Sequence, residues 1–98
     1  MTVIRHISVR GRVQGVGFRA FVEHEALKRH LSGWVRNRRD STVEAVFSGE
    51  AAAVAAAVEA CRRGPMSGRV DAIYERDGDA EDLKLLRPGE VFSVLSTA

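Results

Sequence analysis

Three glycines followed by an arginine form the stretch of this sequence that is best suited to chemistry. Gly11, Gly15 and Gly17 precede Phe18 and Arg19. Glycine allows the backbone to turn with positive φ, so successive N–H groups can surround a small anion. If a helix begins here, its unpaired N–H groups add to that attraction, and a guanidinium can bind two phosphate oxygens at once. The stretch therefore predicts a phosphate pocket, although the glycine spacing alone is more typical of a tight strand-to-helix turn.

This loop does not match the two common phosphate-binding motifs. No Lys-Ser or Lys-Thr pair follows the glycines, as a P-loop requires. The glycines are spaced G-x-x-x-G-x-G rather than G-x-G-x-x-G, and 98 residues are too few for a doubly wound sheet. A nucleotide-binding fold of either kind is therefore excluded.

The distribution of charge points to the same part of the chain. The formal net charge is +2, but residues 1–39 carry nine basic and two acidic side chains, and residues 40–98 carry six and eleven. The basic first third indicates a local anion site, although arginines that only solvate strand edges would give the same excess.

The remaining composition excludes several classes of protein. Hydrophobic residues make up 45% and charged residues 29%, as in a globular domain. The single cysteine, Cys61, excludes an intramolecular disulfide, and His6, His24 and His30 lack metal-ligand spacing, so we expect no metal. No apolar stretch approaches 18 residues and no signal-peptide core is present, so we expect one cytoplasmic domain, residues 1–98, without membrane contact.

The elements that must position these residues follow from periodicity and turn signals. Alternating apolar residues predict strands, and runs of good helix formers without glycine or proline predict helices. We expect strands at 6–10, 33–37, 42–47, 69–75 and 90–95, helices at 19–30 and 50–63, and a short helical turn near 81–86. The order predicts a ferredoxin-like α+β sandwich of the β-α-β-β-α-β type. In this fold two helices cover one face of an antiparallel sheet, here with a short fifth strand.

Two motifs in this framework resemble those of the acylphosphatase family. Residues 11–19, GRVQGVGFR, match the family signature G-x-V-Q-G-V-x-F-R, and residues 33–37, GWVRN, match G-W-V-x-N at the family's spacing. The resemblance extends from about residue 3 to residue 95, and it implies the same split βαβ fold.

The resemblance implies hydrolysis of small acyl phosphates to a carboxylate and inorganic phosphate. Arg19 would bind the phosphate and Asn37 would orient the attacking water. The backbone amides around the phosphate would be those of Gln14, Gly15, Val16, Gly17 and Phe18. The leaving group is a carboxylate and the substrate's own phosphate oxygen can take the proton, so neither a basic side chain nor a cofactor is needed. The family and the small size favour a monomer.

The sequence departs from the family pattern at positions that concern geometry rather than chemistry. His30 replaces the usual glycine after the first helix, Arg29 replaces a leucine or isoleucine, and Ser41 replaces the glycine of the hairpin turn. A non-glycine residue disfavours a left-handed helix end, so we expect changes in that end and in the turn. Gly17 lies at a variable position of the signature and adds flexibility to the loop.

Two other functions remain to be weighed against hydrolysis. The same fold could serve as a non-catalytic anion-binding or regulatory module, such as those at the N-terminus of larger hydrogenase-maturation proteins. RNA-recognition domains share the element order, but they need aromatic residues on the central strands. Here the first strand has none and the hairpin's return strand offers only Phe47, so we expect no nucleic-acid partner.

Overall fold

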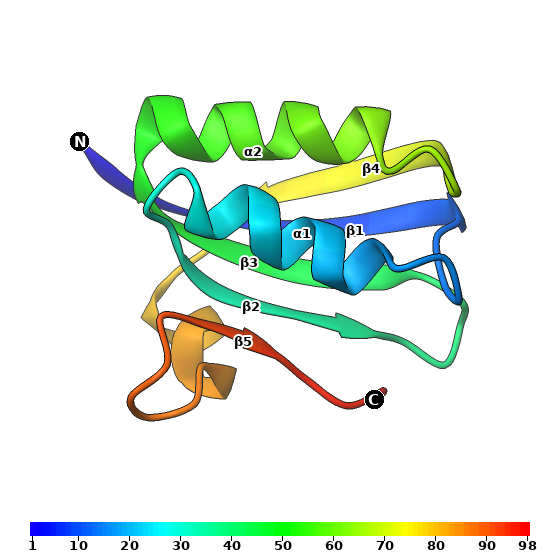
Figure 1. Cartoon of the computed structure of the whole chain (residues 1–98). Coiled ribbons are helices and arrows are strands. Elements are labelled where there is room, and N and C mark those ends of the chain that lie inside the picture. The colour runs from blue at the N-terminus through cyan, green and yellow to red at the C-terminus, as the bar shows by residue number, and fades with distance from the viewer.

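Eight elements follow one another along the chain, and the computed structural model describes all residues 1–98. They are β1 (Thr2–Arg12), α1 (Phe18–Leu27), β2 (Ser32–Asn37), β3 (Val43–Glu50), α2 (Ala51–Arg63), β4 (Arg69–Asp77), the 3-10 helix η1 (Ala80–Leu85) and β5 (Phe92–Val94). Both helices lie on the same face of the sheet (Figure 1). The predicted ferredoxin-like α+β fold is therefore confirmed. Neither helix is long and apolar enough to cross a membrane.

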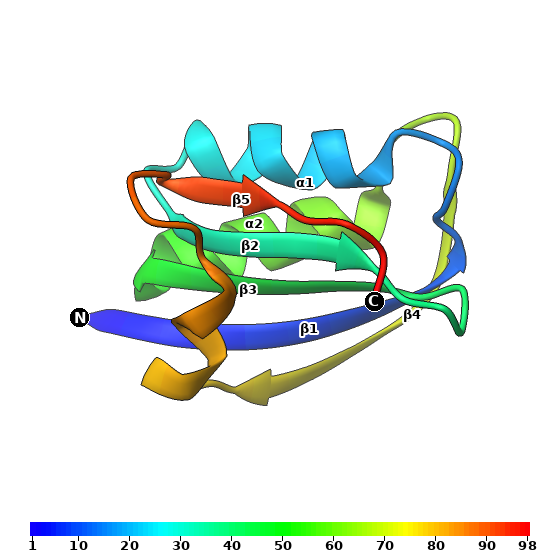
Figure 2. The ribbon, with the colours of Figure 1, turned by 90° about the horizontal axis from the view of Figure 1, so that it is seen from below.

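The strands form a single sheet in the order β4-β1-β3-β2-β5. All neighbours are antiparallel except β2 and β5, so the sheet is mixed rather than wholly antiparallel. In Figure 2, β5 and the segment after it lie along the outer edge of β2. This arrangement brings the end of the chain to the end of β2, where Asn37 lies, and therefore to the predicted site.

Alternation along the strands sends one set of side chains into the core between sheet and helices. Ile7 and Val9 of β1 and Phe47 of β3 are fully buried there, against Val22 of α1 and Val58 of α2. Phe47 stacks on Phe92 of β5, with ring centroids 6.0 Å apart. The one aromatic residue of β3 therefore lies in the core and not on the helix-free face of the sheet.

Cys61 belongs to the same core. Its side chain is fully buried, and burial is the main reason why its pKa rises to about 12. A thiol this difficult to ionise is a packing group and a poor nucleophile.

Two residues that stand where glycine was expected, His30 and Ser41, adopt the left-handed backbone that favours glycine. Helix α1 ends at Leu27, three residues before the predicted end, and His30 takes φ +60°. The buried Leu31 then donates its N–H to the carbonyl of Ala26 at 3.0 Å, which closes the helix. Ser41 in the turn before β3 takes φ +77°. Packing of Leu31 thus overrides the local preference of His30.

Candidate active site

The loop between β1 and α1 presents a row of unpaired backbone donors. Gly15 and Gly17 have φ of +73° and +80°, and Gly17 is the N-cap of α1. The N–H groups of residues 15–20 donate to no acceptor in the protein. A left-handed glycine followed by a helix N-terminus is the arrangement that gathers N–H groups around an anion. Gly17 was expected only to add flexibility, but the loop takes a left-handed conformation at this position, which favours glycine.

Three side chains hold this loop in place. The side-chain amide of Gln14 donates to the carbonyls of Arg38 and Thr42, at 2.7 and 2.9 Å, in the turn between β2 and β3. On the other side, the hydroxyl of Ser67 donates to the carbonyl of Val16 at 2.8 Å. Phe18 anchors the end of the loop in the core, where it is 1% exposed. The loop is thus fixed between two neighbouring segments.

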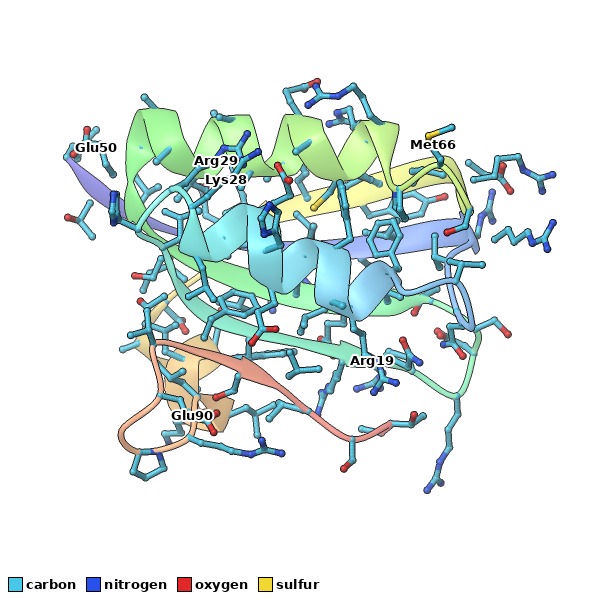
Figure 3. All side chains as sticks on the ribbon, viewed as in Figure 1. Arg19, Lys28, Arg29, Glu50, Met66 and Glu90 are labelled. Carbon is cyan, nitrogen blue, oxygen red and sulfur yellow. The ribbon has the colours of Figure 1, made fainter.

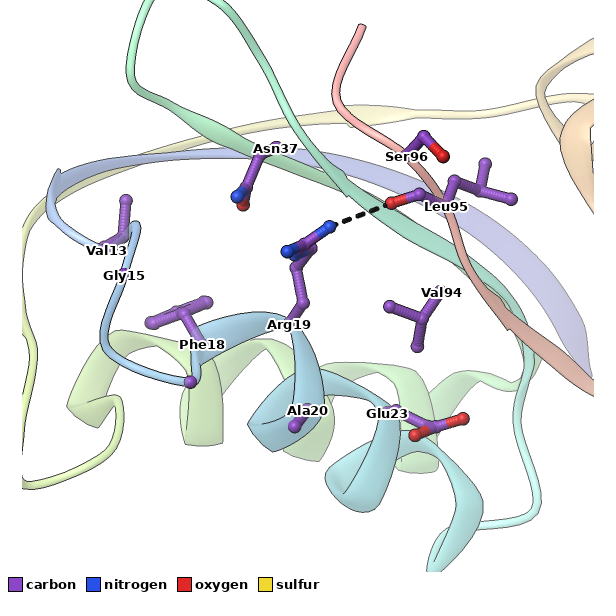
Figure 4. A pocket seen from close by; sticks show the side chains of 11 residues that line it. Val13, Gly15, Phe18, Arg19, Ala20, Glu23, Asn37, Val94, Leu95 and Ser96 are labelled. Atoms are coloured by element: carbon purple, nitrogen blue, oxygen red, sulfur yellow. Dashed lines mark hydrogen bonds between the residues drawn. The ribbon is translucent and has the colours of Figure 1, made fainter.

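Arg19 stands in the first turn of α1 and reaches away from the helix towards the end of β2 (Figure 3). Its Nη1 donates to the carbonyl of Leu95, in the segment after β5, at 3.1 Å (Figure 4). Leu95 itself is held at the sheet edge, because its N–H donates to the carbonyl of Val35 at 2.9 Å. One N–H of the guanidinium is therefore fixed, and the others remain available to a ligand.

Asn37 closes β2 and points into the same space from the opposite wall. It pairs with Val43 across the hairpin, and its carbonyl accepts the N–H of Ala98 at 3.0 Å. Figure 4 shows its amide and the Arg19 guanidinium facing the gap beside the glycine loop. Because this end of β2 is paired on both sides, the backbone from which the Asn37 side chain extends is held in place.

These groups line one cavity of about 550 Å³. Of the residues proposed for the site, Gly15, Gly17, Phe18, Arg19 and Asn37 line it. Gln14 and Val16 do not line it, since they face the neighbouring segments described above. The other lining residues are Val13, Ala20, Glu23, Val94, Leu95 and Ser96.

Glu23 and Leu95 also line the cavity but are not among the site residues predicted from the sequence. Glu23 follows Arg19 by four positions on α1, and this spacing on a helix was a signal that could have found it. Nothing comparable marks Leu95, whose contact with Arg19 spans 76 positions. Contacts of this kind arise only from the pairing of β5 with β2.

The electrostatics of the cavity are simple. Arg19 and Glu23 are the charged residues that line it. No three His, Cys, Asp or Glu side chains gather anywhere in the structure as a metal site would require. Trp34 lies elsewhere, under η1, where its indole N–H donates to the carbonyl of Asp82 at 2.6 Å. The site can therefore offer backbone donors, one guanidinium and one amide to an anion.

Comparison with known proteins agrees on one family. The family model described as acylphosphatase matches residues 5–84. A protein of Rhodopseudomonas palustris (strain BisB18) named acylphosphatase is 57% identical over 96 residues, which are 98% of this chain and 97% of that protein. The crystal structure of acylphosphatase from Bacillus subtilis is similar with a TM-score of 0.81 at 40% identity, covering 97% of this chain and 99% of the other.

A larger protein contains a similar fold. The structure of full-length HypF in a phosphate- and nucleotide-bound form matches with a TM-score of 0.83 at 29% identity. The match covers 99% of this chain but 12% of HypF.

Proposed function

The chain belongs to the acylphosphatase family and is an acylphosphatase enzyme, and we propose that residues 14–19 bind the phosphate of its acyl phosphate substrate while Asn37 orients the attacking water. The substrate we propose is a small molecule, and the catalytic unit is the single domain of residues 1–98. The observation that carries the proposal is the set of unpaired N–H groups of Gly15 and residues 17–20, all of which belong to residues that line the cavity together with Asn37.

Phosphate binding follows from the charges and donors of the loop. Backbone N–H groups do not move when charge develops, so they stabilise a phosphoryl group without reorganising. The Arg19 guanidinium supplies a full positive charge and paired donors for two oxygens. Gln14 and Val16 serve this binding through their backbone, while the Gln14 side chain and the Val16 carbonyl fix the loop.

The chemical step needs position more than proton transfer. The water oxygen forms a bond to phosphorus, and the bond between phosphorus and the acyl oxygen breaks in line with it. The acyl group leaves as a carboxylate, and the proton of the water passes to a phosphate oxygen of the substrate. Because that carboxylate is a good leaving group, the attack of water on the bound phosphoryl group needs only an amide that holds the water in line.

Replacement of Asn37 tests the proposal. With benzoyl phosphate as substrate and chelator present, Asn37→Ala should lower kcat by about 100-fold, the size expected when a reacting group loses its alignment. Inorganic phosphate should inhibit wild type and variant with the same constant, because the loop and Arg19 are unchanged. Steady-state phosphate release measures both quantities.

Ser32→Ala, at the opposite end of β2, is the control and should keep wild-type turnover. Near-normal kcat in Asn37→Ala would overturn the water-orienting role. Phosphate binding by a folded wild type without hydrolysis would instead indicate the anion-binding module. The predicted monomeric state, cytoplasmic location and lack of a nucleic-acid partner stay predictions, which sedimentation, cell fractionation and oligonucleotide titration test.

A further inference from the structure

One charged side chain of the cavity has no part in the proposed reaction. Glu23 is half-buried and lines the cavity together with Val94. Its position is one helical turn beyond Arg19 on α1, about 6 Å along the helix axis.

The cations near Glu23 are engaged elsewhere. Lys28 and Arg29, in the turn that follows α1, both pair with Glu25, at 3.3 and 2.7 Å. Arg19 is drawn to the carbonyl of Leu95 and forms no salt bridge with Glu23. The cavity therefore contains a positive charge at one point and an uncompensated negative charge about one turn away.

In-line attack fixes which part of the substrate meets this negative charge. If Asn37 holds the water on one side of the phosphorus, the acyl oxygen must leave from the opposite side. Figure 4 shows Asn37 and Glu23 on opposite sides of the Arg19 guanidinium. With the phosphate bound against the Arg19 guanidinium, as proposed above, the acyl group extends towards Glu23 and Val94.

We propose that Glu23 is a specificity-determining residue, which disfavours acyl phosphates whose acyl group carries a negative charge and favours those with an uncharged or cationic acyl group. This inference rests on the proposed function, because it uses the direction in which the acyl group leaves. Val94 contributes the apolar surface for the carbon chain. The Glu23 carboxylate repels anionic substituents on the acyl group and attracts cationic ones.

Three rigid substrates of one shape test the inference. They are benzoyl phosphate, 4-carboxybenzoyl phosphate and 4-(aminomethyl)benzoyl phosphate, which differ in a charge at the far end of the ring. For each enzyme, kcat/KM of a charged substrate is divided by kcat/KM of benzoyl phosphate. Comparison of this ratio between variants cancels intrinsic differences in substrate reactivity.

Glu23→Gln should raise the ratio for the carboxylate substrate about tenfold and lower the ratio for the cationic substrate about tenfold, as one charge near the surface at this distance implies. Glu23→Asp should keep the wild-type order of preference, and Glu23→Lys should reverse it. Glu59→Gln on α2 makes the same change of net charge away from the cavity, and its ratios should equal those of the wild type.

The outcomes separate the two proposals. If wild type hydrolyses benzoyl phosphate but Glu23→Gln leaves both ratios unchanged, the specificity role is overturned and the proposed function stands. Equal shifts in Glu23→Gln and Glu59→Gln would also overturn it, since net charge would then be the cause. If a folded wild type hydrolyses none of the three substrates, the proposed function fails and this inference fails with it.

Discussion

Arg19 combines charge with a fixed direction, and both matter for the phosphate it is proposed to bind. Its hydrogen bond to the carbonyl of Leu95 uses Nη1 and leaves the remaining guanidinium donors free. A lysine at this position would keep the charge but could not bond Leu95 and hold two phosphate oxygens in one plane. The planar fork is therefore the feature to test.

Arg19→Lys should lower kcat/KM for benzoyl phosphate about 10²- to 10³-fold, the usual cost of losing a positioned donor in a transition state. It should also weaken competitive inhibition by inorganic phosphate. Arg39→Lys is the matched control, because Arg39 is exposed in the nearby turn. Lysine at position 19 with full activity would show that charge alone suffices.

Particular residues show how far the sequence could predict the site. The spacing of the two motifs places Arg19 at a helix start and Asn37 at a strand end, and the structure brings both to one cavity. The role of Leu95 could not be predicted, because it depends on a parallel pair between β2 and β5 that leaves no local pattern. The spacing of Glu23 from Arg19 could have indicated its place, but its lack of a salt-bridge partner could not be predicted, because it depends on the pairing of Lys28 and Arg29 with Glu25.

At the scale of elements, helix α1 has a left-handed residue at each end. At the start, Gly17 adopts φ +80° without a Cβ to strain it. At the end, His30 adopts φ +60°, although its side chain is exposed and forms no hydrogen bond. The helix length could not be predicted from residue preferences, because burial of Leu31 selects this turn in spite of them.

His30→Gly should raise the free energy of unfolding by about 0.5 to 1 kcal/mol, since relief of the left-handed strain exceeds the added flexibility of the unfolded chain. Urea unfolding followed by circular dichroism measures the change. Lys28→Gly, at φ −68° in the same turn, should instead destabilise by about 0.5 to 1 kcal/mol. A loss of stability in His30→Gly equal to that of Lys28→Gly would show that His30 is not strained.

At the scale of the whole molecule, a charged network joins three strands on the face of the sheet that the helices leave open. Glu44 of β3 bonds His6 of β1 at 2.7 Å and Arg36 of β2 at 2.7 Å, and it lies 3.3 Å from Arg38. The carbonyl of Arg38 in turn accepts the side-chain amide of Gln14. The network therefore supports the hairpin turn on which the glycine loop rests.

The same network gives the fold a pH dependence. The hydrogen bond with His6 is the largest cause that brings the pKa of Glu44 from 4.5 down to about 2; burial opposes it, and the bond and charge of Arg36 add to it. Because the folded state holds the carboxylate ionised, its stabilisation is complete above the unfolded pKa of 4.5 and is lost as the pH falls towards about 2.

Glu44→Gln should therefore destabilise the protein by about 2 to 3 kcal/mol at pH 7, and the difference from wild type should shrink steadily between pH 5 and pH 2. Urea unfolding at several pH values across this range measures it. Glu81→Gln, an exposed carboxylate on η1, is the control for the general effect of net charge. A difference that stayed constant with pH would mean that Glu44 contributes packing and not its charge. If the difference shrinks for Glu44→Gln but not for Glu81→Gln, the charge of Glu44 contributes about 2 to 3 kcal/mol to the free energy of unfolding. That is a substantial share of the roughly 5 to 15 kcal/mol that usually separates folded from unfolded chains.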